Sequence, residues 1–261
     1  GRTPGAGFNT TDPLTVATSE FDPLPPASAL GLSAFYVSLL SIMSGFMGAI
    51  LVHTTVDAAL GYGVTEIGPR WRQRMPVAIS RWRTLLAKWI VAVVVEPVLT
   101  GILLLVSIGL LGMNAPSSWE LWLFTSFAAV VIALGTLALF AALGSLGQLV
   151  AMLLFIYLAL ASSGGTIPIQ ALPSALRFVA NFEPLRQVLD GVRALLYFGG
   201  AWDAGLTRGV VMTSVGLVLW LVVGWAVTTW YDRTGRDRLE PEILEYVHRS
   251  AQAYTAGGGA P

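Results

Sequence analysis

Apolar residues gather into five long runs along the chain, separated by shorter polar connections. The runs cover roughly residues 30–52, 89–113, 121–143, 146–162 and 210–230. A helix needs about 20 apolar residues, within a range of about 17 to 25, to cross the hydrocarbon core of a bilayer. The pattern therefore predicts five transmembrane helices within residues 29–231, the fourth of them marginal in length.

The first 28 residues are of a different kind. They are rich in Gly, Pro, Thr and Asp and have no apolar period, which predicts an extended polar approach to the membrane. The chain starts without Met and without the pattern of a signal peptide. We therefore expect residues 1–28 to be the end of an extracellular region in a longer protein.

Composition agrees with this pattern. Hydrophobic residues make up 55% of the chain and charged residues only 11%, whereas about a quarter of the residues in a soluble domain are charged. We expect an all-α polytopic membrane protein. Cysteine is absent, and the sequence lacks a phosphate-binding loop, H-E-x-x-H and G-x-S-x-G. We therefore expect no cofactor, no bound metal and no enzymatic activity, and His53 and His248 are interpreted as isolated polar residues near the membrane surface.

Charge predicts the orientation. The connection at residues 53–88 has two acidic and six basic residues: Arg70, Arg72, Arg74, Arg81, Arg83 and Lys88. Short connections rich in Lys and Arg stay on the cytoplasmic side. Residues 1–28 and 163–208 would then lie outside the plasma membrane, and the tail at 232–261 would be cytoplasmic. The four Arg residues within 163–208 are a partial conflict.

The same six basic residues are candidates for contact with anionic lipid or for coupling to a partner protein. Trp71, Trp82 and Trp89 are interleaved with them, and Trp residues beside basic ones anchor helices at a membrane surface. We favour lipid anchoring over nucleic-acid binding, and expect membrane lipids but no nucleic acid as partners.

Glu96 is the one acidic residue well inside a predicted span, and Pro97 follows it. A central Asp costs about 2.5–3.5 kcal/mol on insertion scales, so an acid at depth usually faces a cavity or a partner. Glu96 is thus a candidate substrate or proton site. We favour the alternative that it lies only about 10 Å from the cytoplasmic face and either reaches the surface or pairs with an Arg of the connection. Pro97 predicts a kink.

Residues 164–200 are too polar to cross a bilayer. Pro173 and Pro184 predict two short helices within residues 173–198. The second places apolar residues on one face and charged residues on the other. At about 22 Å it is too short to span, so we expect it to dip into the outer leaflet or lie on it. The candidate gating residues in this connection are Glu183, Arg186, Asp190 and Arg193.

Four short motifs carry a resemblance to a known family. They are Gly164-Gly165-Thr166-Ile167-Pro168, Leu172-Pro173, Pro184-Leu185-Arg186 and Asp190-Gly191-Val192-Arg193. The series resembles the membrane domain of type-2 ABC exporters, and more closely the YhgE/Pip (phage infection protein) family and its actinobacterial relatives. The resemblance implies that the five spans equal spans two to six of a permease, with a pair of short extracellular helices before the last. It also implies a homodimer or larger membrane complex and a separate ATPase subunit, which residues 54–88 would contact.

Three functions remain open at this point. The first is export or handling of a lipid or another amphipathic compound of the cell envelope. The second is a non-transporting scaffold or receptor whose missing extracellular domain binds a partner. A weaker third is an enzyme embedded in the membrane, which would require Glu96 or the outer acids.

Overall fold

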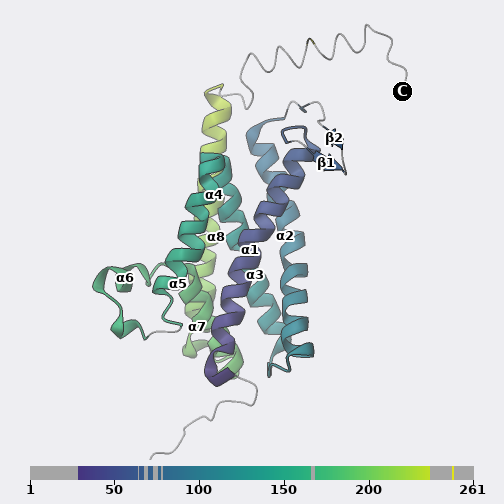
Figure 1. The fold of residues 1–261 in the computed structure, drawn as a ribbon. Helices are drawn as coiled ribbons and strands as arrows, with labels where there is room; N and C mark the ends of the chain where they lie inside the picture. Colours follow the sequence, from purple (N-terminus) through teal and green to yellow (C-terminus); the bar gives the residue numbers. More distant parts are fainter. Residues whose placement is uncertain are drawn as a thin grey trace, which may run out of the picture.

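The computed structural model describes residues 29–63, 65–67, 70–72, 76, 77, 79–165, 168–235 and 249. Five of its helical segments are long and apolar enough to cross a membrane, which confirms the predicted all-helical polytopic fold. They are Ser33–Ala59 (α1), Arg81–Leu110 (α2 and the turn that follows it), Ser118–Leu143 (α3), Ser145–Ser162 (α4 to α5) and Leu206–Arg233 (α8). Figure 1 shows them side by side in one bundle.

Two of these spans are not α-helical throughout. The α-helix α2 (Arg81–Leu105) ends in a π-helical turn, Val106–Leu110. The fourth span consists of α4 (Ser145–Met152), a π-helical turn at Leu153–Tyr157, and α5 (Leu158–Ser162). Turns of this kind often occur at functional positions.

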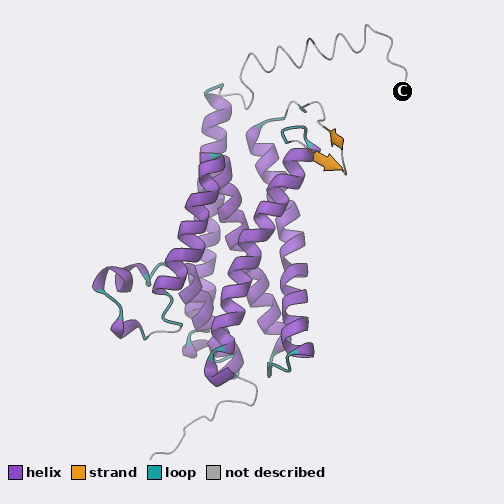
Figure 2. Ribbon diagram, in the orientation of Figure 1, coloured by secondary structure: helices purple, strands orange, loops and turns teal. Residues whose placement is uncertain are grey.

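The connections carry the remaining elements, as Figure 2 shows by colour. A hairpin of two short strands, β1 (Thr65–Ile67) and β2 (Arg70–Arg72), follows α1. Two short helices, α6 (Ser174–Val179) and α7 (Pro184–Tyr197), precede α8 and match the expected pair. Single 3-10 turns occupy Ala29–Gly31, Ile169–Ala171 and Trp202–Ala204.

Helix α3 lies in the middle of the bundle, packed against α1, α2 and α8. Several of its buried positions are small: Ala129, Ala133 and Ala138 are fully buried. Gly45 of α1 sits against the backbone of Ala129, so closely that a Cβ at Gly45 would overlap the carbonyl oxygen. Small residues allow such approach between helices in lipid, where no hydrophobic force drives association.

The predicted span limits were too narrow at one end of the bundle. α1 continues to Ala59 and α2 begins at Arg81, so the connection expected at 53–88 is much shorter. Polar residues extend these helices because they find partners there: Asp57 forms an ion pair with Lys88 at 2.8 Å. Likewise α8 continues to Arg233, beyond the predicted start of the tail at 232.

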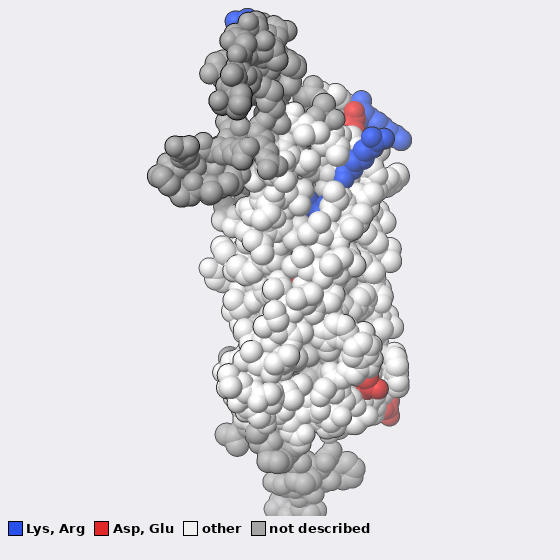
Figure 3. Space-filling view, turned by 90° about the vertical axis from the view of Figure 1, so that its right-hand side faces the viewer, with Lys and Arg blue, Asp and Glu red and all other residues white. Residues whose placement is uncertain are grey.

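The two ends of the bundle carry different charges. We call the end that holds the close of α1 and α8 and the start of α2 the basic end, and the opposite end the α7 end. Arg81, Arg83, Lys88 and Arg233 lie at the basic end. Figure 3 shows Lys and Arg gathered at the upper end of one face with an acidic group beside them, acidic groups alone at the lower end, and an almost uncharged surface between the two ends. Such a belt is what a bilayer requires.

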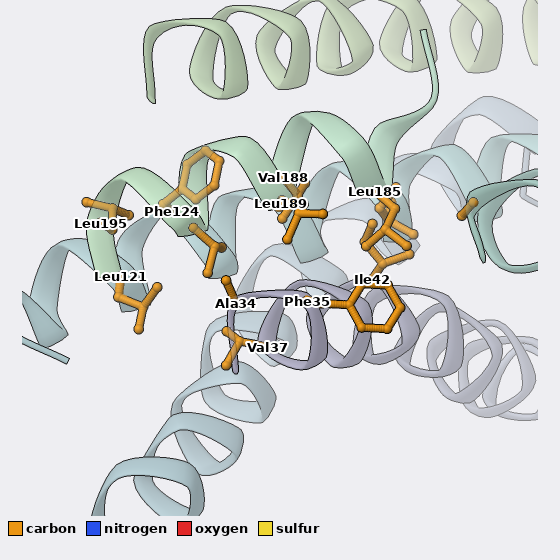
Figure 4. Packing of buried hydrophobic residues seen from close by; sticks show 14 of the residues in the cluster. Ala34, Phe35, Val37, Ile42, Leu121, Phe124, Leu185, Val188, Leu189 and Leu195 are labelled. Atoms are coloured by element: carbon orange, nitrogen blue, oxygen red, sulfur yellow. The ribbon is translucent and has the colours of Figure 1, made fainter. Parts of the chain in front are cut away.

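The apolar face of α7 is covered by other helices of the bundle. Its apolar side chains, including Leu185, Val188 and Leu189, are at most 1% exposed. They point into the bundle toward Phe35 and Ile42 of α1, as Figure 4 shows. The helix packs on α1, α3 and α8, so protein and not lipid covers this face, and its expected position at the outer leaflet stays a prediction. A stripe of apolar residues fits lipid and protein equally well, so sequence periodicity could not distinguish them.

Candidate functional site

The start of α7 is held by Glu183. Its carboxylate accepts hydrogen bonds from the backbone N–H groups of Leu185 and Arg186, as an N-cap does for a helix whose first N–H groups have no partner in the helix itself. Pro184 is the first helical residue, as predicted, whereas Pro173 lies one residue before α6. Only 3% of Glu183 is exposed, and this burial raises the pKa of its carboxyl from 4.5 to about 7, against the effect of the two N–H donors and of Arg186.

The charged face of α7 meets the start of α8. Arg186 Nε lies 3.9 Å from Asp190 Oδ2, close to the pairing expected from their spacing. Burial raises the pKa of Asp190, while the charges of Arg186, Arg193 and Arg208 act in the opposite direction. Gly205, the residue before α8, packs on Asp190, and its positive φ of 122° is one that glycine adopts readily.

Gln187 connects the two helices and was not singled out by the sequence. Its side chain is 2% exposed. Its amide nitrogen donates to Asn181 O at 3.0 Å, and its oxygen accepts from Arg208 Nε at 2.9 Å. A neutral amide gives no charge or motif signal, so only its position at the α7–α8 contact reveals it.

Glu96 lies between α1 and α2 and is fully buried. Ser44 Oγ donates to its Oε2 at 3.2 Å, and Oε1 has no hydrogen-bond partner in the described part of the chain. Gly48 lies directly against the carboxylate, where a Cβ would overlap Oε1. Ser44 and Gly48 also line a groove of about 450 Å³ between α1 and α2.

The favoured interpretation of Glu96 was therefore wrong. Glu96 is fully buried, about 22 Å along α2 from Arg81, so its side chain does not reach the surface. Its hydrogen-bond partner is Ser44, and no ion pair with an Arg forms among the described residues. The alternative, a carboxyl facing a partner deep inside a span, describes its surroundings. The helix continues through Pro97, whose carbonyl accepts from Trp122 Nε1 at 2.9 Å.

The basic end holds a second polar cluster, which the sequence analysis missed. Lys88, 3% exposed, donates from Nζ to His53 Nδ1 at 2.9 Å and pairs with Asp57 at 2.8 Å. His53 Nε2 lies 3.4 Å from the other oxygen of Asp57. His53 was interpreted as isolated because its partners lie a helical turn and 35 residues away. A cavity of about 730 Å³ opens above this cluster.

The remaining basic residues are placed differently. Arg81 lies over the ring of Tyr231 at 5.0 Å, and Arg83 is in the first turn of α2. Arg70 and Arg72 belong to β2, whose side chains are outside the described residues, as is all of Arg74. Trp89 is not a surface anchor: it is 4% exposed and donates to Leu134 O at 3.2 Å.

Two further candidates from the sequence have a limited role in this geometry. Arg193 is half-buried on α7 and acts on Asp190 through its charge. Residues 1–28, most of the tail and His248 lie outside the described residues. Within the part of the chain that is described, no three His, Cys, Asp or Glu side chains gather in a metal-binding group.

These observations define a class: a multi-pass helical membrane protein that holds polar groups between its spans, as permeases do. The chain belongs to the ABC-2 family transporter proteins, whose family model matches residues 8–230, and this confirms the resemblance drawn from the motifs. A relative from Bacillus subtilis (strain 168), "Uncharacterized protein YhgE", is 27% identical over 133 residues. That match covers 48% of this chain and 16% of the relative. No solved structure matches the chain.

Proposed function

We propose that this chain is the membrane-spanning part of a permease that exports or handles an amphipathic compound of the cell envelope, a lipid or a lipid-like molecule. The observation that carries the proposal is the position of α7. This helix brings Arg186, Gln187 and Asp190 to the ends of three apolar spans. A molecule with a polar head and an apolar tail needs polar groups beside an apolar surface.

The proposal includes an orientation and an energy source. The basic end faces the cytoplasm, because Lys and Arg concentrate on that side of membrane proteins, and the α7 end faces outward. Permeases of this family generally work with a separate ATPase subunit, and the cavity beside His53 and Lys88 offers a place for it to bind. The assembly is a homodimer or larger complex in the plasma membrane.

Reconstitution tests this function directly. The intact protein would be purified with its native partners, placed in vesicles containing a fluorescent phospholipid, and assayed for ATP-dependent movement of the lipid between leaflets. We expect movement that Asp190→Asn reduces and that Glu120→Gln, a change of an exposed acid at the same end, leaves intact.

The opposite result has a definite meaning. If no ATPase accompanies the protein and ATP does not stimulate movement, transport is excluded. If charge reversal of Arg186, Asp190 and Arg193 also leaves the cellular role intact, the chain is a scaffold or receptor anchor instead.

A further inference from the structure

A lateral pocket lies between α7 and α8, apart from the groove near Glu96. It has a volume of about 300 Å³, the lower end of the range for small-molecule sites. Its walls are apolar and come from α3, the π-helical turn of the fourth span, α7 and α8; they include Ile132, Phe155, Val188, Gly216 and Trp220. Its two polar contributors are Gln187 and Thr213.

The pocket opens toward the lipid belt. Phe182, Val215 and Leu219 line it and are each more than half exposed. In a bilayer such side chains contact acyl chains, since water is absent from the hydrocarbon core. An apolar chain can therefore enter from the side without crossing water, and the volume suits one acyl chain better than a whole lipid.

A cationic group stands above one wall of this pocket. Arg208, Met212 and Gly216 follow one another at intervals of four on α8, so they share a face of that helix. Arg208 is about 12 Å along the axis from Gly216 and about 18 Å from Trp220. Its Nε is fixed by Gln187, itself a lining residue.

The terminal nitrogens of Arg208 are available. Its only hydrogen bond with the described residues is through Nε, and it forms no ion pair with any of them. Asp190 feels its charge, but the nearest basic atom to the Asp190 carboxylate is Arg186 Nε at 3.9 Å. With Nε engaged, the two terminal nitrogens of Arg208 still offer one pair of parallel N–H donors, which matches the geometry of a phosphate oxygen pair.

We infer that this pocket is a binding site for an anionic phospholipid, with one acyl chain between α3, α7 and α8 and the phosphate on Arg208. The inference rests on the proposed function and specifies its substrate class. The site selects for the phosphate through Arg208 and holds the acyl chain through apolar contact, so mutations can separate the two properties.

Photo-crosslinking of the intact protein in nanodiscs tests the site. Phosphatidylglycerol, or a diacylglycerol that lacks the phosphate, would carry a diazirine on one acyl chain, and labelled peptides would be mapped. We expect labelling within residues 212–220 and 128–132, stronger for the anionic lipid. Arg208→Gln should lower the preference for phosphatidylglycerol about tenfold, the size of one lost charge-assisted hydrogen bond, while Arg208→Lys should retain most of it.

A matched pair of variants on α8 tests the chain site. Gly216→Leu extends into the pocket, since a Cβ there meets only Val131 at ordinary contact distance, 3.4 Å. Val218 is 60% exposed on the same helix and does not line the pocket. Gly216→Leu should abolish labelling by both lipids, and Val218→Leu should not. If Gly216→Leu fails to fold, the comparison of Arg208→Gln with Arg208→Lys still tests the site.

Two outcomes would overturn the site: labelling spread uniformly around the bundle, and labelling that neither Arg208→Gln nor Gly216→Leu changes. Either result would mean that lipid only forms a layer on the surface of the bundle. The outcome is distinct from failure of the proposed function. Selective labelling without ATP-dependent movement leaves the site and removes transport, whereas movement without selective labelling removes the site alone.

Discussion

Glu96 and Glu183 are both buried carboxyls, yet their surroundings differ. Glu183 has both oxygens occupied by the first N–H groups of α7. Glu96 has one hydrogen bond, from Ser44, and an unpartnered oxygen within the described residues. The carboxyl of Glu183 stabilises the start of a helix, whereas that of Glu96 still has an unused hydrogen-bond acceptor. Burial alone does not mark a functional acid; the count of satisfied oxygens distinguishes the two.

The largest effect should come from removing the cap. Glu183→Ala leaves two N–H groups at the start of α7 without their acceptor, and should lower the free energy of unfolding at pH 5 by about 3 kcal/mol. Thermal unfolding in detergent measures it. Glu120→Ala, at an exposed position, is the control and should change stability by less than about 0.5 kcal/mol. Equal losses for the two variants would contradict the capping role.

The next effect is a dependence on pH. The pKa of Glu183 is about 7 in the folded protein and 4.5 without burial, so the folded state holds the proton more tightly. Its contribution is therefore fully present below pH 4.5 and is lost as the pH rises through 7, by about 3 kcal/mol. Melting curves across this range should show the loss in the wild type and not in Glu183→Gln. A wild type that gains stability with pH in parallel with the variant would refute the shift.

The region around Glu96 should respond to crowding. Gly48→Ala places a methyl group on Glu96 Oε1 and should cost about 2 kcal/mol. Glu96→Ala removes the obstructing atoms, so Gly48→Ala should cost much less in that background. The two single variants and the double variant form a thermodynamic cycle. Additive losses would mean that Gly48 and Glu96 do not contact one another.

The smallest change in stability should follow replacement of Glu96 itself. Leu has a volume similar to that of Glu and no desolvation penalty. Glu96→Leu should therefore lower the free energy of unfolding by no more than about 1 kcal/mol, or raise it. The same variant should lose transport in the vesicle assay while it keeps its stability. Glu183→Ala, in contrast, should lose stability. A stable and fully active Glu96→Leu would reduce Glu96 to a packing residue.

The five spans and the helix pair could be predicted because runs of apolar residues and proline positions are local signals. The helix ends could not be predicted. His53 and Lys88 are 35 residues apart, and their contact, which stabilises the end of α1 and the start of α2, gives no local signal in the sequence. The hydrogen-bond partner of Glu96 could not be predicted for the same reason, since Ser44 lies 52 residues earlier in the chain.

The candidate site was visible only in part. The charged residues of α7 stood out as a face, but its apolar stripe gave no sign of whether protein or lipid covers it. Gln187 and Arg208 lie 21 residues apart and join only when α7 folds back on α8. Long-range pairs of this kind require the folded arrangement.

The start of α2 depends on the end of the last span. Asp232 accepts hydrogen bonds from the backbone of Arg81 and Trp82, at 2.9 and 3.2 Å, across about 150 residues of chain. These two N–H groups gain this acceptor only when the last span has packed beside α2, so the first turn of the second span is completed by the end of the fifth. A variant without the carboxylate of Asp232 would lack the acceptor for both groups.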